Sequence, residues 1–226
     1  MRYQLFGTNG SGSGIVEMAL AEIGAEYELH DVALETNQQR SSAYARVNPQ
    51  RKLPTLITPA GETLTESAAI VLVLDERHPE ARLLPARGSP ERAQALRWLA
   101  FLASELYPIV EINDYPERFV PDAASAPGVR ELARRIWRER WLLVEDAIMG
   151  KPWLLASGFC WTDVYLAVLS RWAQQEAWRP RNLPKVEAIA QAVAQRERIA
   201  AVWQRHHGVK AGAAGGAQPS PANQPV

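Results

Sequence analysis

The stretch that constrains the fold most is residues 48–67, NPQRKLPTLITPAGETLTES, where a short strand, a tight turn and a helix start fall within twenty residues. Residues 53–58 alternate apolar and polar side chains, residues 59–62 supply a turn, and residues 63–65 can return as an antiparallel strand. Pro54 removes a backbone N–H at the entrance of the first strand. This end of the strand therefore presents an edge with which another molecule could pair.

A helix is expected to follow, opened by Glu66 and Ser67 and continued by the apolar residues 68–77. Its first backbone N–H groups have no partner inside the helix and lie at the positive end of the helix dipole. Such a helix start suits a ligand carboxylate. An ordinary β-hairpin followed by a capped helix would show the same residues, but we favour a ligand site because its elements follow one another in the required order.

Composition limits the classes of function. Lys plus Arg number 25 and Asp plus Glu also number 25, so the chain has no net charge with which to attract nucleic acid or an anionic membrane. The one cysteine excludes an internal disulfide and fits a reducing compartment. The first residues lead directly into a strand pattern without a long apolar run. We therefore expect neither a signal peptide nor a membrane span, and a cytoplasmic location.

The first elements of the chain alternate between strand and helix. Residues 2–6 predict a strand, residues 7–14 form a loop with four glycines, and residues 15–23 show apolar side chains at helical spacing before Gly24. A strand, a glycine-rich loop and a helix also occur in dinucleotide sites. The glycine spacing here is not G-x-G-x-x-G, so we reject a dinucleotide site.

A second strand is predicted at residues 27–32 and a short helix at residues 41–47, stopped by Asn48-Pro49. With the hairpin and its helix, the order of elements becomes β-α-β-α-β-β-α. This order matches a thioredoxin-like α/β domain that ends near His78.

Two motifs described above, NPQRKLPTL and TES, together resemble the N-terminal half of the glutathione transferases. The resemblance implies a cis bond before Pro54, whereas sequence physics alone predicts trans, since only about 5–6% of X–Pro bonds are cis. It also implies that the Leu53 backbone pairs with the cysteinyl unit of glutathione and that Lys52 faces its glycine carboxylate. Glu66 and Ser67 would hold its γ-glutamyl end.

Bound glutathione would need a reactive thiol, because a free thiol with a pKa near 8.5 is only about 3% ionised at pH 7. Lowering that pKa by about two units requires roughly 2.7 kcal/mol. A hydroxyl that donates to a charged acceptor supplies about 1.5–3 kcal/mol and a helix N-terminus about 0.3–1 kcal/mol. A serine at the start of the first helix could therefore suffice, whereas Tyr3 lies too early, inside the strand.

Ser11 and Ser13 are the hydroxyls at that helix start. Counting back from Ala19-Leu20 places the catalytic serine or cysteine of the family near positions 10–12, which favours Ser11, with Ser13 as the alternative. A serine in a glycine-rich turn can also serve the turn alone, and both interpretations stay open.

The second half of the chain predicts an all-α helical bundle, since all eight tryptophans lie between Trp98 and Trp203 and no strand pattern follows Thr65. Ser89-Pro90 supplies a helix start. Apolar residues at helical spacing predict one helix at Leu96, Leu99, Ala103 and Leu106, up to the Pro108 region. A second helix is expected at Leu132, Ile136, Leu143 and Ile148, ended by Gly150. Residues 161–178 and 184–206 supply the remaining helices.

Phe159-Cys160-Trp161-Thr162-Asp163-Val164 resembles the capping box of the same family, with Asp163 accepting from the N-cap N–H. Cys160 replaces the usual serine or threonine, and its thiol is a poor acceptor. A catalytic role for Cys160 is disfavoured, because no histidine is placed to activate it.

The resulting organisation is a thioredoxin-like glutathione-binding domain at 1–79, a linker at 80–88, an all-α domain at 89–207 and a tail at 208–226, which is the glutathione transferase fold. The tail is rich in Gly, Ala, Pro, Gln and Ser, so we expect it to be disordered. His206-His207 is interpreted as a frayed helix end rather than a metal site, and no metal is expected.

The resemblance implies a glutathione transferase that transfers an alkyl or aryl group, with a homodimer as its assembly. A small apolar electrophile would lie between the domains, against a wall formed by Tyr107, Tyr115 and Phe119, although aromatic residues at such spacing also form cores. A binding or regulatory protein that keeps the fold without turnover is the alternative. An isomerase of the zeta type is less favoured, because the loop lacks a Ser-Ser-Cys run.

Overall fold

Four short strands form one mixed sheet in the computed structural model, which describes residues 2–173 and 177–208. The strand order is β2-β1-β3-β4, with β1 parallel to β2 and with β3 antiparallel to both of its neighbours. Leu5 and Leu56 face each other across β1 and β3 and are fully buried. The strands are β1 (Tyr3–Gly7), β2 (Tyr27–Asp31), β3 (Thr55–Ile57) and β4 (Thr63–Thr65).

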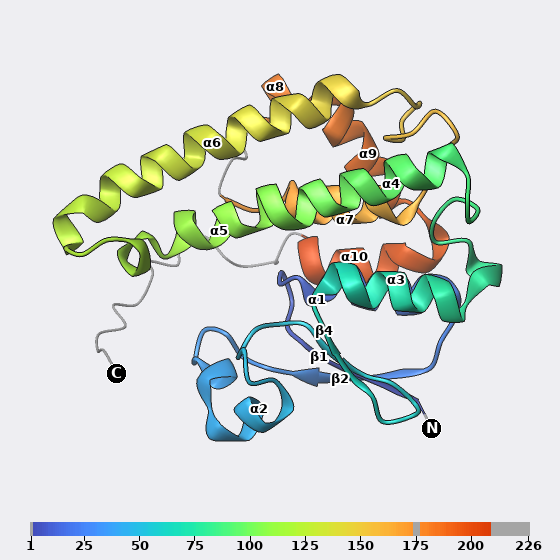
Figure 1. The fold of residues 1–226 in the computed structure, drawn as a ribbon, viewed down its shortest axis with the longest axis horizontal. Helices are drawn as coiled ribbons and strands as arrows, with labels where there is room; N and C mark the ends of the chain where they lie inside the picture. Colours follow the sequence, from blue (N-terminus) through green and yellow to red (C-terminus); the bar gives the residue numbers. More distant parts are fainter. Residues whose placement is uncertain (1, 174–176, 209–226) are drawn as a thin grey trace.

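Helices α1 (Ser13–Ile23) and α3 (Ser67–Arg77) cover the face of the sheet that looks toward the C-terminal helices, whereas α2 (Ser42–Val47) lies on the opposite side (Figure 1). Gly24 ends α1 with a φ of 70°, a left-handed conformation that glycine adopts without strain. The predicted order β-α-β-α-β-β-α is confirmed.

The hairpin that begins at Pro54 has the predicted form, because β3 and β4 pair as antiparallel neighbours. The bond between Leu53 and Pro54 is cis, as the family resemblance implies and as general X–Pro preferences do not.

The predicted helix start at Ser89-Pro90 is confirmed, since Ser89 Oγ accepts the N–H of Arg92 at the start of α4 (Pro90–Phe101). The sequence predicts that helical structure ends near Pro108, but the helical chain continues beyond this residue. It passes through a π-helical turn (Leu102–Leu106) into α5 (Tyr107–Asp114). Pro108 occupies the first turn of α5, where a missing N–H costs little.

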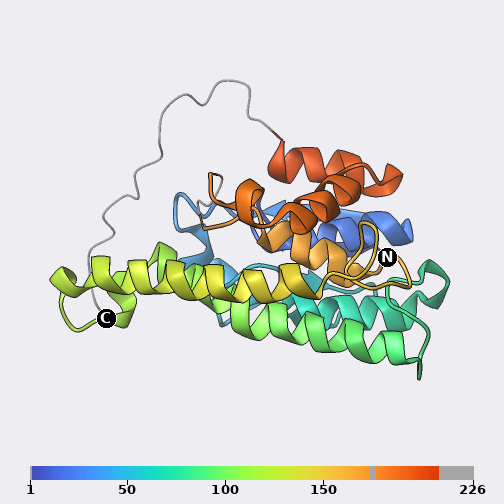
Figure 2. The ribbon, with the colours of Figure 1, turned by 90° about the horizontal axis from the view of Figure 1, so that it is seen from above.

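The remaining helices form the all-α domain, and no strand follows Thr65 in the part of the chain that the structure describes, apart from one isolated bridge. Figure 2 shows the longest helix, α6, running alongside α4 and α5. The helices are α6 (Ala126–Ala147), α7 (Trp161–Leu169), α8 (Arg179–Asn182), α9 (Pro184–Ala194) and α10 (Glu197–His207), with 3-10 turns at Gln38–Arg40, Pro79–Ala81, Pro116–Phe119 and Ala123–Ser125.

The buried face of α6 agrees only in part with the predicted one, because Ile148 is buried and Ile136 packs against the core, whereas the two leucines do not. Leu132 and Leu143 are 43% and 57% exposed. The core instead receives Trp137, Trp141 and Val144, which follow one another at spacings of four and three residues. Both faces of α6 carry apolar residues, and the larger tryptophans occupy the core because they bury more surface.

Helix α7 lies in the centre of the molecule, with every one of its residues buried. Its capping box is confirmed, because the Asp163 carboxylate accepts the N–H of Cys160 at 2.9 Å and that of Leu154 at 2.8 Å. Burial raises the pKa of the Cys160 thiol to about 12, so this group stays a thiol at neutral pH.

Within residues 2–173 and 177–208, no helix combines the length and the apolar character that a membrane crossing needs. The same residues contain no group of three or more His, Cys, Asp or Glu side chains arranged to hold a metal. The predicted tail lies outside the described residues, apart from Gly208. The boundaries at 79, 88 and 207 stay predictions.

Candidate functional site

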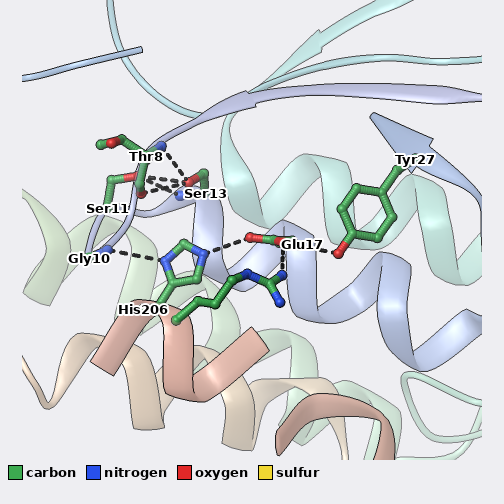
Figure 3. Close-up of polar contacts among 8 residues, drawn as sticks. Thr8, Gly10, Ser11, Ser13, Glu17, Tyr27 and His206 are labelled. Atoms are coloured by element: carbon green, nitrogen blue, oxygen red, sulfur yellow. Dashed lines mark hydrogen bonds and ion pairs between the residues drawn. The ribbon is translucent and has the colours of Figure 1, made fainter. Parts of the chain in front are cut away.

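The loop between β1 and α1 contains both predicted serines, and their hydroxyls contact each other with a separation of 2.8 Å (Figure 3). Ser11 Oγ donates to the Thr8 carbonyl oxygen at 2.8 Å. Ser13 Oγ lies 3.2 Å from the same carbonyl and is fully buried, whereas Ser11 is partly exposed. Of the two serines, Ser11 is the one that has exposed surface.

The glycines of this loop make room for side chains that pack against it. A Cβ atom at Gly12 would overlap the Tyr107 hydroxyl, and one at Gly14 would lie 2.8 Å from His206 Nδ1. Gly12 is also the N-cap of α1 and has no side chain with which to cap it. Contacts with the C-terminal domain therefore explain why Gly12 and Gly14 lack side chains.

Tyr107 is the residue of the predicted aromatic wall that the structure brings to the loop. Its ring meets Trp172 edge-on, with centroids 5.1 Å apart. Burial raises the pKa of Tyr107 above its usual range, so the hydroxyl remains a donor. Tyr115 and Phe119 are 44% and 49% exposed, and neither makes a hydrogen bond to the loop within the described residues.

His206 contacts the loop, which the sequence did not predict. Its Nδ1 lies 3.1 Å from the Gly10 N–H and its Nε2 lies 2.7 Å from Glu17 Oε2 (Figure 3). The side chains of His206 and Glu17 are each only 1% exposed. The interpretation of His206 as part of a frayed helix end is therefore wrong, because the end of α10 packs against α1.

Glu17 is the charged centre of this contact. Tyr27 Oη donates to Glu17 Oε1 at 3.0 Å, and the Arg205 guanidinium pairs with the same oxygen. Burial by itself would raise the pKa of Glu17, but the hydrogen bonds from His206 and Arg205, together with the charge of Arg205, outweigh burial and lower it. Glu17 is therefore a carboxylate. Burial and the charge of Glu17 raise the pKa of Tyr27 to about 12.

Two side-chain hydrogen bonds fix the backbone of the segment before the cis proline. Tyr44 Oη and Asn48 Nδ2 both donate to the Lys52 carbonyl oxygen, at 2.8 and 2.9 Å. The backbone N–H and C=O of Leu53 make no hydrogen bond within the described part of the chain. Leu53 thus offers the predicted free edge.

The Lys52 ammonium forms an ion pair at this edge. Lys52 Nζ lies 3.0 Å from Glu111 Oε2, on α5, in an ion pair whose side chains are 65% and 36% exposed. Arg118 Nη1 also contacts Glu111, at 3.3 Å. The C-terminal domain therefore reaches the predicted carboxylate site as well.

The start of α3 combines a left-handed residue with a buried hydroxyl. Glu66 is exposed and has φ 62° and ψ 102°, which is uncommon for a residue with a side chain and marks local strain. Ser67 is 5% exposed, and its Oγ lies 3.0 Å from the hydroxyl of Tyr165 on α7. Burial raises the pKa of Tyr165 to about 12.

Two tyrosines connect the two helix starts. Tyr107 faces Gly12 at the start of α1, Tyr165 bonds Ser67 at the start of α3, and the two rings lie 6.5 Å apart. The positive ends of two helix dipoles therefore lie next to hydroxyl donors, which suits an anionic or thiolate ligand.

Comparison with known proteins identifies one family model, described as the glutathione S-transferase N-terminal domain, which matches residues 13–77. The chain is 29% identical to the GST-like protein YncG of Escherichia coli K12, over 90% of this chain and 98% of that protein. It is 30% identical to a maleylacetoacetate isomerase of Pseudomonas aeruginosa, over 67% of this chain and 71% of that protein.

Among solved structures, a glutathione transferase homologue from Sulfitobacter, crystallised with bound glutathione, superposes with a TM-score of 0.82 at 25% identity. The match covers 89% of this chain and 96% of that one.

Proposed function

Since this chain belongs to the glutathione S-transferase family, we propose that it binds glutathione and transfers an alkyl or aryl group from a small apolar electrophile to the glutathione sulfur. The thiolate would attack the electrophilic carbon, so that a carbon–sulfur bond forms while the bond to the leaving group breaks and its electron pair departs with that group. The observation that carries this proposal is the pair of helix starts joined through Tyr107 and Tyr165 beside the free edge at Leu53.

The tripeptide would be held at three points. The unpaired backbone of Leu53, before the cis Pro54, pairs with the cysteinyl unit. Glu66 pairs with the α-ammonium group of the γ-glutamyl end, and Ser67 with its α-carboxylate. Lys52 faces the glycine carboxylate, for which it must share or leave Glu111.

Ser11 is the proposed donor to the sulfur, because this residue is partly exposed next to the start of α1 whereas Ser13 is fully buried. Its proton is directed at the Thr8 carbonyl and would have to turn toward the thiolate. A charge-assisted hydrogen bond of about 1.5–3 kcal/mol offsets the weaker neutral bond of about 0.5–1.5 kcal/mol. The Tyr107 hydroxyl faces Gly12 and has no hydrogen-bond partner among the described residues. It would act as a second donor to the sulfur.

The electrophile would occupy the space between the domains. Tyr107 would provide an apolar ring next to the sulfur, and Tyr115 and Phe119, exposed beyond the end of α5, would extend the wall. Because the Ser11 hydroxyl and the wall come from different domains, turnover would require both domains.

Calorimetric titration and ultraviolet difference absorbance test this function. Wild-type protein should bind glutathione and lower the pKa of its thiol, and Glu66→Ala should weaken binding by about 2 kcal/mol. Ser11→Ala should raise the thiol pKa by about one to two units with little loss of binding, whereas Ser13→Ala should leave it unchanged. Tyr107→Phe separates the second donor from the first.

The outcome also separates the alternatives. If glutathione binds with its thiol pKa at the free value and a panel of electrophiles is not turned over, the chain is a binding protein. Isomerisation of maleylacetoacetate, the activity named for the Pseudomonas relative, is the further assay to include.

A cytoplasmic homodimer remains part of the proposal, with the N-terminal domain of one subunit packed on the α-domain of the other. Leu142 and Leu143 on α6, and Met149 after it, are large apolar side chains with exposures of 42–68%, which supports an association. Light scattering at micromolar concentration should give twice the mass of 25.1 kDa. A monomer mass over a wide concentration range would contradict it.

A further inference from the structure

The backbone N–H and C=O of Gly10 both form hydrogen bonds with the C-terminal domain. Its N–H donates to His206 Nδ1 at 3.1 Å, and its C=O accepts from Trp172 Nε1 at 3.0 Å (Figure 3 shows the contact with His206). Gly10 has a φ of 77°, so the loop turns sharply at this residue. The Ser11 N–H closes the turn on the Thr8 carbonyl oxygen at 3.2 Å, but both hydrogen bonds of the Gly10 backbone itself come from the C-terminal domain.

The hydrogen bonds define the tautomer of His206. A backbone N–H can only donate, so Nδ1 must accept and carries no proton in this geometry. Nε2 then carries the proton and donates to the Glu17 carboxylate. Arg205 and Tyr27 hold that carboxylate from its other oxygen. The His206 ring is thus aligned by three elements: α10, α1 and β2.

We propose that His206 and Trp172 are positioning residues that hold the Gly10 peptide so that Ser11 and the start of α1 face the glutathione sulfur. This inference rests on the proposed function for the identity of the ligand. The holding of the loop itself rests only on the contacts described above.

The consequence follows from the position of Gly10 in the chain. Ser11 is the next residue, and its hydroxyl direction is set by the turn that Gly10 makes. Trp172 also lies edge-on against Tyr107, so the second proposed donor rests against a residue that holds the first. Loss of either contact should therefore change the pKa of the bound thiol more than the affinity for the tripeptide, whose ends would be held by Lys52, Glu66 and Ser67.

Two substitutions of one residue separate positioning from packing. In His206→Asn the side-chain oxygen lies as many bonds from Cβ as Nδ1 does, so it can still accept from Gly10. In His206→Gln the amide instead reaches the position of Nε2, keeping Glu17 and losing Gly10. Gln204→Ala, at an exposed position of the same helix, is the control.

The first measurement uses the ligand-free protein. Amide hydrogen exchange followed by NMR should be roughly tenfold or more faster at Gly10 in His206→Gln, and within about threefold of wild type in His206→Asn and Gln204→Ala. Equal effects of the Asn and Gln variants, or none, would overturn the positioning role.

The second measurement uses the glutathione complex and the pKa of the bound thiol. His206→Gln and Trp172→Phe, which keeps a ring and removes the N–H, should each raise it by about half a unit or more while the dissociation constant changes less than about threefold. Trp153→Phe, on a tryptophan that packs with Phe159, is the matched control. If His206→Gln does not fold, Trp172→Phe alone decides.

The results distinguish the two proposals. If wild-type protein lowers the thiol pKa and neither variant changes it, the proposed function stands and the positioning role is overturned. If wild-type protein does not bind glutathione, the proposed function fails, and the exchange measurement alone decides whether His206 holds the loop.

Discussion

The starts of α1 and α3 lie side by side yet obtain their polar groups in different ways. The start of α3 uses its own sequence, Glu66 and Ser67, and receives one hydroxyl from Tyr165. The N-cap of α1 is Gly12, which has no side chain with which to cap the helix. Its loop is held by Trp172 and His206, which follow Gly10 by 162 and 196 residues.

The difference shows how the two domains share the site. A local motif can present ligand groups by itself, so the start of α3 should tolerate changes in the C-terminal domain. The glycine loop cannot do so in the same way, because Gly10 and Gly12 carry no side chains and, among the described residues, the backbone of Gly10 bonds only to His206 and Trp172. Changes at the contact of α1 with α10 should therefore have larger effects than changes at α3.

The largest effect is expected for Glu17→Ala. It leaves the buried His206 without its acceptor and removes the partner of Arg205 and Tyr27. Removing one partner of a buried pair costs about 3–5 kcal/mol, and since Arg205 is 45% exposed we expect the lower end, about 3 kcal/mol. Urea-induced unfolding measures it, with Glu26→Ala, at an exposed position, as the control. A loss below about 1 kcal/mol would remove Glu17 as the centre of the contact.

Glu17 also predicts a pH dependence. Its pKa is lowered from 4.5 in the folded chain, so the unfolded chain binds a proton first as the pH falls. The stabilisation is thus complete above about pH 4.5 and is lost as the pH falls through the folded pKa. The difference in unfolding free energy between wild type and Glu17→Gln should be constant near neutral pH and shrink in acid. A difference that grows in acid would contradict the lowered pKa.

The next effect is expected for Gly12→Ala, because the new methyl group would overlap the Tyr107 hydroxyl. Overpacking of this kind costs about 1–3 kcal/mol. In the Tyr107→Phe background the nearest remaining atom is the ring carbon Cζ at 3.3 Å, so most of the cost should disappear. A double-mutant cycle by urea unfolding measures this rescue. Additive losses would mean that Tyr107 does not pack against Gly12.

A smaller effect is expected at the start of α3, where Ser67 and Tyr165 share one hydrogen bond. Ser67→Ala and Tyr165→Phe each leave one buried hydroxyl without this partner, at a cost of about 1–3 kcal/mol, and the double variant should cost about 1 kcal/mol less than their sum. Because Glu66 keeps its place, glutathione affinity should fall less in Tyr165→Phe than in Ser67→Ala. Equal losses of affinity would mean that α3 depends on the C-terminal domain as much as α1 does.

Local signals account for what the sequence predicted correctly. The cap at Ser89, the left-handed Gly24 and the carboxylate of Asp163 each act on backbone groups within a few residues. The hairpin at Pro54 is similarly short-range, although its cis bond needed a family resemblance.

Long-range packing accounts for what the sequence did not predict. The chain neighbours of His206 indicate a frayed helix end, yet its partner Glu17 lies on α1. A signal was present, because His206 continues the buried stripe of Ile199, Val202 and Trp203 on α10. On α6 two apolar faces competed, and spacing alone could not show which one the core would accept.

The smallest effect on stability is expected for Glu111→Gln, at the point where the C-terminal domain reaches the binding edge of the N-terminal domain. The ion pair of Lys52 with Glu111 is exposed, so its loss should change the unfolding free energy by less than about 0.5 kcal/mol. Glutathione affinity should instead increase by about two- to fivefold, since Lys52 no longer divides its charge between Glu111 and the glycine carboxylate.

Calorimetric titration at low and high salt checks the effect of Glu111→Gln, because an electrostatic gain should shrink as ions screen the charges. Glu117→Gln removes the same charge from an exposed position beyond α5 and serves as the control. If both variants tighten binding equally, the gain comes from net charge and not from Lys52. If Glu111→Gln weakens binding, Glu111 aligns Lys52 instead of competing for it, and the start of α3 and its neighbouring edge depend on the C-terminal domain in the same way as the glycine loop.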